Sequence, residues 1–285
     1  ENELTMTRSY FLGGVDRAMK VLDAFTVETP ELRLTDLSNR LGIPKPQVLR
    51  IVSTLEHGGY LERDPQTKRY RLGIRLFQLG MIVQQTMDIR RIALPWLRKL
   101  AAETQETVGL FVPDSYGPVC IEVIDSPKGL RVFAQVGRRM PWNAGTAAKV
   151  ILAYLPDDQR EAILTRDHFK RYTPQTITEP EHLREICETI RCQGVHVAIR
   201  DLDDDALGVG APIFNHEGRI AAALSIGAPV SRTCAGDLAR YSTLVREAAC
   251  AISHQLGYHR DDDDPWLLAR PDVVSQHMDA GEDSG

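Results

Sequence analysis

The sequence predicts an α+β chain in which an N-terminal winged helix-turn-helix is joined by a linker helix to an α/β body with a mostly antiparallel sheet. Three observations predict this class. Residues 34–72 show two short helical patterns, a turn and a basic hairpin. Beyond residue 107, short β-type runs at hairpin spacing alternate with helical patterns. At 285 residues, the chain has the length of two domains.

The second helix of the motif carries the strongest pattern. Its apolar residues recur at i, i+3, i+4 and i+7, namely Val48, Ile51, Val52 and Leu55. Its opposite face presents polar side chains, namely Gln47, Arg50, Ser53 and Thr54. Glutamine and arginine are the side chains that contact adenine and guanine edges in the major groove. This helix is therefore predicted to read DNA.

The first helix of the motif is shorter. Its apolar residues are Leu34, Leu37 and Leu41. Thr35 or a neighbour is expected to cap it, and Gly42 suits the left-handed position that ends a helix. The link to the second helix is short, and Pro44 and Pro46 fit a helix start. The pair has the spacing of a helix-turn-helix.

A basic hairpin follows. Gly58 and Gly59 end the second helix, and residues 60–63 and 69–72 alternate as strands around a turn at 64–68. Residues 44–75 hold seven Lys or Arg against three Asp or Glu. Such a charge excess suits phosphate contacts, although an ordinary charged α/β module is the alternative. The residues predicted to touch DNA are Thr35, Lys45, Pro46, Gln47, Arg50, Ser53, Arg63, Lys68, Arg69 and Arg71.

The net charge of −5 divides unevenly. Residues 261–285 carry −7, which leaves +2 for residues 1–260. The tail 259–285 is acidic and without period, so we expect it to be disordered, either simply solvated or competing with DNA for the wing. Residues 1–12 are expected to be a mobile leader.

Composition excludes several protein classes. The chain has no run of 18 apolar residues and no signal-peptide layout, which predicts a cytoplasmic protein. Its five cysteines are scattered and form no C-x-x-C pair, so buried free thiols are expected, with no metal site and no cofactor.

Between the winged helix-turn-helix and the α/β body, residues 74–90 are predicted to form a linker helix. Leu76, Leu79, Ile82 and Val83 give it an apolar stripe. Pro95 is expected to interrupt or start the next helix. The stripe can pack on its own domain or on a second copy of the chain.

The body, residues 91–258, alternates strands and helices. Strands are predicted at 107–113, 119–125, 130–136, 195–199, 207–214 and 220–226. Helices are predicted at 147–154, 157–164, 180–192 and 236–256.

Four strings resemble the IclR family of bacterial transcriptional regulators: GGVDRAMKVLDAF, LTDLSNRLGIPKPQVLRIVSTLEHGGYLERDPQTKRYRLG, GRRMPWNAGTAAKVILAYLP and APIFNHEGRIAAALSIGAPVSR. The resemblance implies a winged helix-turn-helix at 13–73 and a GAF-like effector-binding domain at 91–258. It further implies a repressor or activator that binds a palindromic operator as a homodimer or homotetramer. The expected effector is a small organic acid, and Trp142 favours an aromatic one.

Three segments are predicted to line the effector pocket: 140–147, 201–208 and 223–229. In the first, free backbone N–H groups near a helix start suit an anion. The Asp run of the second is read as a solvated turn rather than a calcium loop, because it lacks the required Gly and Glu. The predicted effector residues are Arg131, Met140, Trp142, Asn143, Ala144, Gly145, Thr146, Asp205, Gly208, Ser225 and Gly227. Packing in the core is the alternative for Trp142, and a surface position is the alternative for Arg138 and Arg139.

The chain departs from the family pattern at several positions. Pro46 replaces a hydroxyl residue, and Leu49 stands where His or Tyr is common. Trp142-Asn143 replaces a small apolar residue and His, and Gly227 replaces the second of two alternating serines.

Two other functions stay open at this point. One is an enzyme that acts on a small acid in the body, although no catalytic motif is found. The other is a ligand-independent DNA binder, which a filled body cavity would support.

Overall fold

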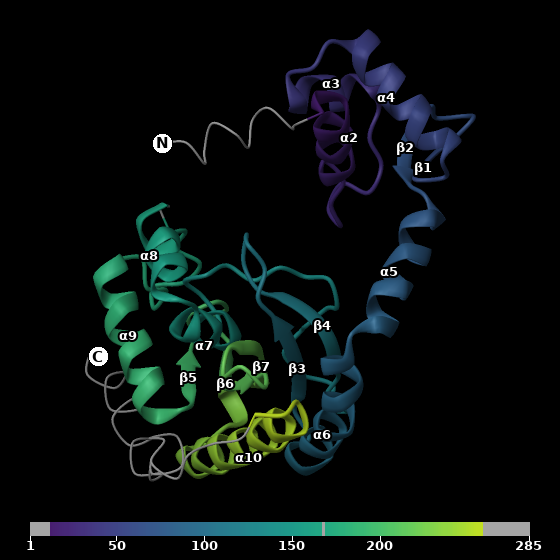
Figure 1. Cartoon of the computed structure of the whole chain (residues 1–285). Helices are drawn as coiled ribbons and strands as arrows, with labels where there is room; N and C mark the ends of the chain where they lie inside the picture. Colours follow the sequence, from purple (N-terminus) through teal and green to yellow (C-terminus); the bar gives the residue numbers. More distant parts are fainter. Residues whose placement is uncertain (1–11, 167–168, 259–285) are drawn as a thin grey trace. The chain divides into compact units, whose positions relative to one another are not determined.

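The computed structural model describes residues 12–166 and 169–258. The predicted tail at 259–285, and all of the predicted leader except Leu12, lie outside this range. The described chain divides into two compact units between Thr86 and Met87 (Figure 1). Each unit has its own hydrophobic core.

The N-terminal unit is a helix-turn-helix with a two-stranded wing. Its elements are α2 (Gly13–Asp23), α3 (Leu34–Leu41), α4 (Lys45–His57), β1 (Leu61–Arg63) and β2 (Tyr70–Leu72). Val48 and Val52, one turn apart on α4, are fully buried against Val21 of α2 and Leu37 of α3. The predicted apolar face of α4 is therefore the side that packs on the other helices.

At the start of α3, Asp36, a neighbour of Thr35, takes the predicted capping role. The residue that precedes the helix is Arg33, and Thr35 lies inside the first turn with its side chain exposed. The Asp36 carboxylate accepts the Arg33 N–H at 2.8 Å. A carboxylate in the first turn also interacts favourably with the helix dipole, which explains why Asp36 takes this role rather than Thr35. Gly42 ends the helix with φ +64°, as predicted.

The wing is an antiparallel hairpin in which Glu62 pairs with Arg71 and Arg63 with Tyr70. At its turn, Asp64 Oδ1 accepts the N–H groups of Gln66 at 2.8 Å and Thr67 at 2.7 Å. These two bonds hold the pKa of Asp64 below its ordinary value, because they stabilise the charged carboxylate. The turn is thus held by its own side chain.

The helices of the linker region have other boundaries than predicted. The helix expected at 74–90 ends earlier, as α5 (Ile74–Thr86), and α6 (Asp88–Thr104) follows after Met87, whose backbone is extended. Pro95 lies inside α6 instead of interrupting it. Buried Ala93, Leu97 and Leu100 anchor α6 to the core, which outweighs the hydrogen bond that proline removes.

The C-terminal unit is built on a five-stranded antiparallel sheet of order β4-β3-β7-β6-β5. Its strands are β3 (Thr107–Val112), β4 (Val119–Ile124), β5 (His196–Ile199), β6 (Ala206–Phe214) and β7 (Ile220–Pro229). Its helices, with α6, are α7 (Thr146–Tyr154), α8 (Asp157–Arg166), α9 (Pro180–Gln193), the 3-10 turn η1 (Val230–Arg232) and α10 (Ala235–Gln255). The predicted α+β class and antiparallel sheet are confirmed.

The two faces of this sheet differ. One face carries large apolar residues such as Leu110, Val209 and Ile226, and α6 and α10 pack on it (Figure 1). The other face carries small or polar residues where β3, β7 and β6 run side by side, such as Thr107, Gly208 and Ser225. Helix α7 covers part of it, and α9 packs against α7. The remaining part of this face is left for a cavity.

The strand predicted at 130–136 is not formed, because residues 127–136 are irregular. Strand β3 is already paired with β4 and β7, and the outer edge of β4 is taken by residues 137–140, which bond to Pro118 and Cys120, so neither strand leaves an edge for this segment. Instead it passes over the sheet face, and Val132 lies against Gly227. We call residues 127–136 the covering segment.

Candidate functional site

Most of the residues predicted to contact DNA lie at the surface of the N-terminal unit. Exposed ones are Thr35, Lys45, Pro46, Arg50, Ser53, Arg63, Lys68 and Arg71, whereas Gln47 and Arg69 are half-buried. Pro46 occupies the second position of α4, where no intrahelical N–H bond is lost. Leu49 is 46% exposed beside Arg50, so the reading face of α4 carries an apolar side chain as well as polar ones.

Several of these side chains have partners inside the unit, including Arg63, which lies over the ring of Tyr70. The Gln47 amide oxygen, in its better-satisfied orientation, accepts from Nε and a terminal nitrogen of Arg17 at 3.3 Å each. Arg71 donates to Glu62 Oε2 at 3.0 and 2.8 Å across the hairpin. Lys68 forms no ion pair with a described residue. It is therefore freer to bind phosphate than Arg71.

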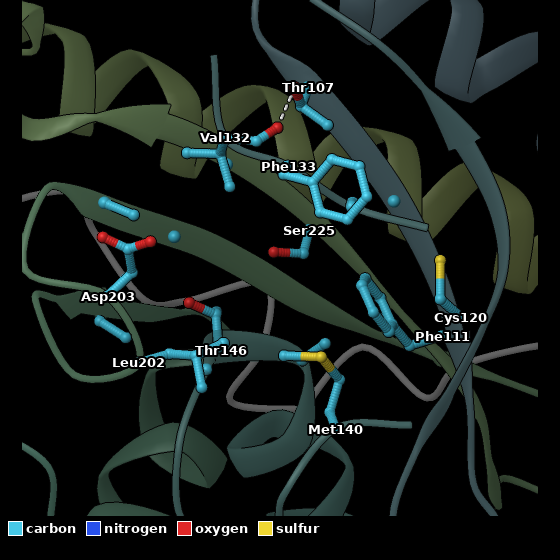
Figure 2. A pocket seen from close by; sticks show the side chains of 18 of the residues that line it. Thr107, Phe111, Cys120, Val132, Phe133, Met140, Thr146, Leu202, Asp203 and Ser225 are labelled. Atoms are coloured by element: carbon cyan, nitrogen blue, oxygen red, sulfur yellow. Dashed lines mark hydrogen bonds between the residues drawn. The ribbon is translucent and has the colours of Figure 1, made fainter. Parts of the chain in front are cut away.

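The C-terminal unit contains a cavity of about 270 Å³ on the small-residue face of the sheet. Five parts of the chain surround it: the sheet, the start of α7, the loop that carries Arg138 and Met140, the turn at 201–203 and the covering segment (Figure 2). The volume is near the lower end of the range for small-molecule sites. The cavity therefore suits a compact ligand.

Two hydroxyl groups face one part of this cavity. Thr146 begins α7 and is only 4% exposed, and its Oγ1 has no hydrogen-bond partner among the described residues. Ser225 projects from β7 toward the same space (Figure 2). Gly208 of β6 lies beneath both, because a Cβ there would collide with the Thr146 hydroxyl and lie 3.8 Å from Ser225 Oγ. A buried hydroxyl without a partner is costly, so this position is suited to a polar ligand atom.

The floor of the cavity holds a buried ion pair. Asp201, which is 6% exposed, accepts the Gly145 N–H at 3.1 and 3.2 Å and pairs with the ammonium of Lys149, which is 2% exposed. The carboxylate thus occupies one of the N–H groups at the start of α7 that we expected to bind an anion. Because Asp201 is buried, the expectation that the Asp run is a solvated turn is wrong for this residue.

Aromatic side chains line the rest of the cavity. The ring of Phe111 folds back over Gly109 on β3, and Phe133 of the covering segment is 67% exposed at the edge (Figure 2). A register shift pairs Leu110 with Glu122 but Phe111 with Cys120, so both Phe111 and Cys120 reach the cavity. Burial raises the pKa of the Cys120 thiol to about 11, which keeps it protonated at neutral pH.

The structure brings together part of the predicted effector set. Six of its residues line the cavity: Met140, Gly145, Thr146, Gly208, Ser225 and Gly227. Trp142 is instead buried in the core around α7, and Ala144 is fully buried. Asn143 Nδ2 donates to Lys170 O at 2.9 Å and to Ile177 O at 2.8 Å, so it fixes a loop. Arg131 and Asp205 are exposed and do not line the cavity.

Sequence reasoning missed several lining residues, including Thr107, Phe111, Cys120 and Phe133. Asp201 and Asp203 lie in the predicted segment 201–208, but no buried partner was predicted for either. One signal was available: Lys149 is the only charged residue in the apolar run TAAKVILAY, and a lone lysine in a buried helix implies a buried carboxylate partner. The lining role of Phe133 had no such signal, since it follows from a segment crossing the sheet. Arg138 lines the cavity, whereas its neighbour Arg139 pairs with Asp114.

Other chemistry finds little support in the described residues. They contain no cluster of three or more His, Cys, Asp or Glu side chains placed to hold a metal ion. Within the same ranges, no helix has the length and apolar character needed to cross a bilayer. Cys192 and Cys234 are exposed, which corrects the expectation that all five thiols are buried.

Comparison with known proteins gives a consistent result for both units. Residues 14–65 match the model of the IclR helix-turn-helix domain, and residues 81–254 match that of the bacterial transcriptional regulator IclR C-terminal domain. The chain is 32% identical to the HTH-type transcriptional regulator XynR of Escherichia coli (86% of this chain, 97% of XynR). It is 34% identical to the HTH-type transcriptional regulator KipR of Bacillus subtilis, with the same coverage.

A solved structure is similar over most of both chains. It is that of an IclR homolog from Microbacterium hydrocarbonoxydans complexed with 4-hydroxybenzoate. It is 27% identical, covers 86% of this chain and 99% of its own, and superposes with a TM-score of 0.73.

Proposed function

The chain belongs to the IclR family of bacterial transcriptional regulators, and on this premise we propose that its effector is a small organic acid, with an aromatic acid favoured. It is a DNA-binding transcriptional regulator with an effector-binding C-terminal domain, and not an enzyme. The observation that carries the proposal is the cavity in which the buried Thr146 hydroxyl lacks a partner. An open cavity also speaks against a ligand-independent DNA binder.

The cavity residues favour an aromatic acid for three reasons. Phe111 and Phe133 offer ring faces for stacking. Thr146 offers a hydroxyl that needs a polar partner. Among the described lining residues Arg138 is the only cation, and a carboxylate there would gain a charged hydrogen bond. The relative that binds 4-hydroxybenzoate supplies the first compound to test.

Calorimetry of the full chain tests the ligand class. Wild type is titrated with 4-hydroxybenzoate, benzoate and an aliphatic 2-oxo acid, alongside the variants Thr146→Val and Thr189→Val. We expect binding of the aromatic acids and a loss of about tenfold in affinity for Thr146→Val, because one hydrogen bond is removed. Thr189→Val, on the exposed side of α9, should bind as wild type does. If wild type and both variants bind the aromatic acids with equal affinity, the assignment of Thr146 to the effector site is refuted.

For DNA, we propose that α4 enters the major groove, with Gln47 and Arg50 at base edges and Lys45 and Lys68 at phosphates. Selection of an operator from random duplexes, followed by binding at fixed salt, tests this assignment. Arg50→Ala should reduce the preference for the operator over random DNA, because it removes a base contact. Lys45→Gln should weaken both equally, because phosphates carry no sequence. Unchanged preference in Arg50→Ala would refute the reading face.

We also propose that the protein acts as a dimer, alone or paired into a tetramer, on a palindromic operator of a catabolic gene. The support is apolar surface on α5, where Ile74 is 63% and Phe77 65% exposed. Two-fold symmetry would place two α4 helices on half-sites one helical turn apart. Sedimentation should show a smaller species for Phe77→Ser than for the neighbouring control Gln78→Ser. A monomeric wild type would refute the proposal.

A further inference from the structure

The covering segment is held to the body by few contacts. Between residues 129 and 134, no backbone–backbone hydrogen bond to another described residue is formed. The anchors of this stretch come from side chains. Thr107 Oγ1 donates to Val132 O at 2.9 Å, and a terminal nitrogen of Arg232 donates to Leu130 O at 2.6 Å. A segment without a backbone ladder opens at low free energy, so these anchors decide how firmly the cavity is covered.

Glu106 lies at the base of these anchors. It sits between α6 and β3 and is only 1% exposed. Its Oε1 accepts from Lys128 Nζ at 2.9 Å and from Arg232 Nε at 2.9 Å, and its Oε2 accepts from a second Arg232 nitrogen at 2.6 Å. One buried carboxylate therefore binds a cation of the covering segment and a cation of η1.

Arg232 connects this carboxylate to the backbone of the covering segment. Two of its nitrogens form a fork on Glu106, and the third reaches Leu130 O. Glu106 thus holds the segment twice, directly through Lys128 and indirectly through Arg232. The planar guanidinium fixes both contacts in one orientation, which a lysine ammonium cannot do.

We propose that Glu106 is a positioning residue for the effector site, whose buried carboxylate keeps the covering segment over the cavity. The inference rests on the proposed function, since it assigns the cavity to the effector. Val132 and Phe133, on the cavity wall, are held in place by the neighbouring anchors at Leu130 and Val132. An effector would bind only the covered state, so the apparent affinity falls in proportion to the fraction covered.

Loss of the carboxylate should free the segment rather than unfold the domain. The side chains of Arg232 and Lys128 are 25% and 40% exposed, so both cations can turn toward water when Gln replaces Glu106. The large cost of a stranded buried charge is thereby avoided. The core beneath the sheet does not include these side chains.

Hydrogen–deuterium exchange of the full chain without ligand is the first test. The variants are Glu106→Gln, which keeps the shape but not the charge, and Arg232→Lys, which keeps the charge but not the fork. The matched control is Arg184→Lys, which alters the ion pair of α9 with Glu161 far from the cavity. We expect the hydrogen-bonded amides at the two ends of the segment, those of Ser126, Lys128 and Gly137, to exchange about tenfold faster in Glu106→Gln, and less so in Arg232→Lys, while β6 and β7 are unchanged.

Two results would overturn the inference. One is exchange at these three amides that matches wild type and the control. The other is equal acceleration in β6 and β7, which would show a general loss of stability instead of a local one. Lys128→Gln should give a smaller increase than Glu106→Gln, because the Arg232 anchor remains. An equal or larger increase in the exchange rate would show that Lys128 anchors the segment without Glu106, and would overturn the role of Glu106.

Calorimetry with 4-hydroxybenzoate is the second test. Glu106→Gln should bind about tenfold more weakly than wild type, in step with its exchange rate, while Arg184→Lys binds normally. Faster exchange with unchanged affinity would overturn the positioning role. If wild type itself binds none of the tested acids, the proposed ligand class fails, and the exchange result alone decides whether Glu106 holds the segment.

Discussion

Lys149→Met should destabilise the C-terminal unit more than any single loss of a surface charge. The side chains of Lys149 and Asp201 are only 3% and 8% exposed, so water screens neither charge. Without the lysine, the Asp201 carboxylate keeps a single donor, the N–H of Gly145, at 3.1 and 3.2 Å. An uncompensated buried charge of this kind costs about 3–5 kcal/mol. We therefore expect the free energy of unfolding to fall by that amount.

Denaturant unfolding followed by tryptophan fluorescence measures this effect. Trp96 and Trp142 both belong to the C-terminal unit, so the change in their signal follows the unfolding of that unit, whereas Trp266 lies outside the described residues. The double variant Lys149→Met, Asp201→Asn should recover most of the loss, because the asparagine oxygen still accepts the Gly145 N–H without a charge. Arg91→Met breaks an exposed pair with Asp88 and should cost at most about 0.5 kcal/mol. A double variant no more stable than Lys149→Met would refute the reasoning.

Three further outcomes are expected. Lys68→Ala should lower the salt slope of DNA binding by about one, and Arg71→Ala by less, because its charge is already paired with a carboxylate; anisotropy titrations over a range of salt check this. Burial raises the pKa of the Cys120 thiol from 9.0 to about 11, so its contribution to the free energy of unfolding is present below pH 9 and lost as pH rises to 11. In denaturant unfolding measured over this pH range, Cys120→Ala should lack that loss. Gly208→Ala should destabilise by about 1–3 kcal/mol in thermal unfolding because its Cβ collides with α7, whereas Gly129→Ala, with open space around it, should not.

The N-terminal unit followed from the sequence because its patterns are local. The period of Val48 and Val52 sets the buried face of α4, and Gly42 sets the end of α3 through one backbone angle. Both depend on neighbours a few residues away. The start of α3 was less predictable, because a threonine and an aspartate in the same turn compete for the same role.

The cavity was only partly predictable, because its walls come from residues distant in sequence. For Trp142 the sequence left a ligand contact and packing in the core both open, and the structure places it in the core around α7. The alternation in the covering segment, with apolar Leu130, Val132 and Val136, is what a strand would show. Whether a strand edge is available to pair with depends on the whole sheet, which local periodicity does not report.

Contacts between distant residues also connect the covering segment to the chain that follows α6. α5 continues through Met87 into α6, and α6 packs on the sheet face opposite the cavity, so a ligand does not touch it. The covering segment and its start nevertheless meet the chain just after α6: Ser126 Oγ donates to Gln105 O at 2.7 Å, Lys128 pairs with Glu106, and Thr107 holds Val132. Allosteric coupling is typically about 1–3 kcal/mol, which a few hydrogen bonds at three consecutive residues can supply. The contacts of the covering segment therefore converge on the three residues that directly follow α6.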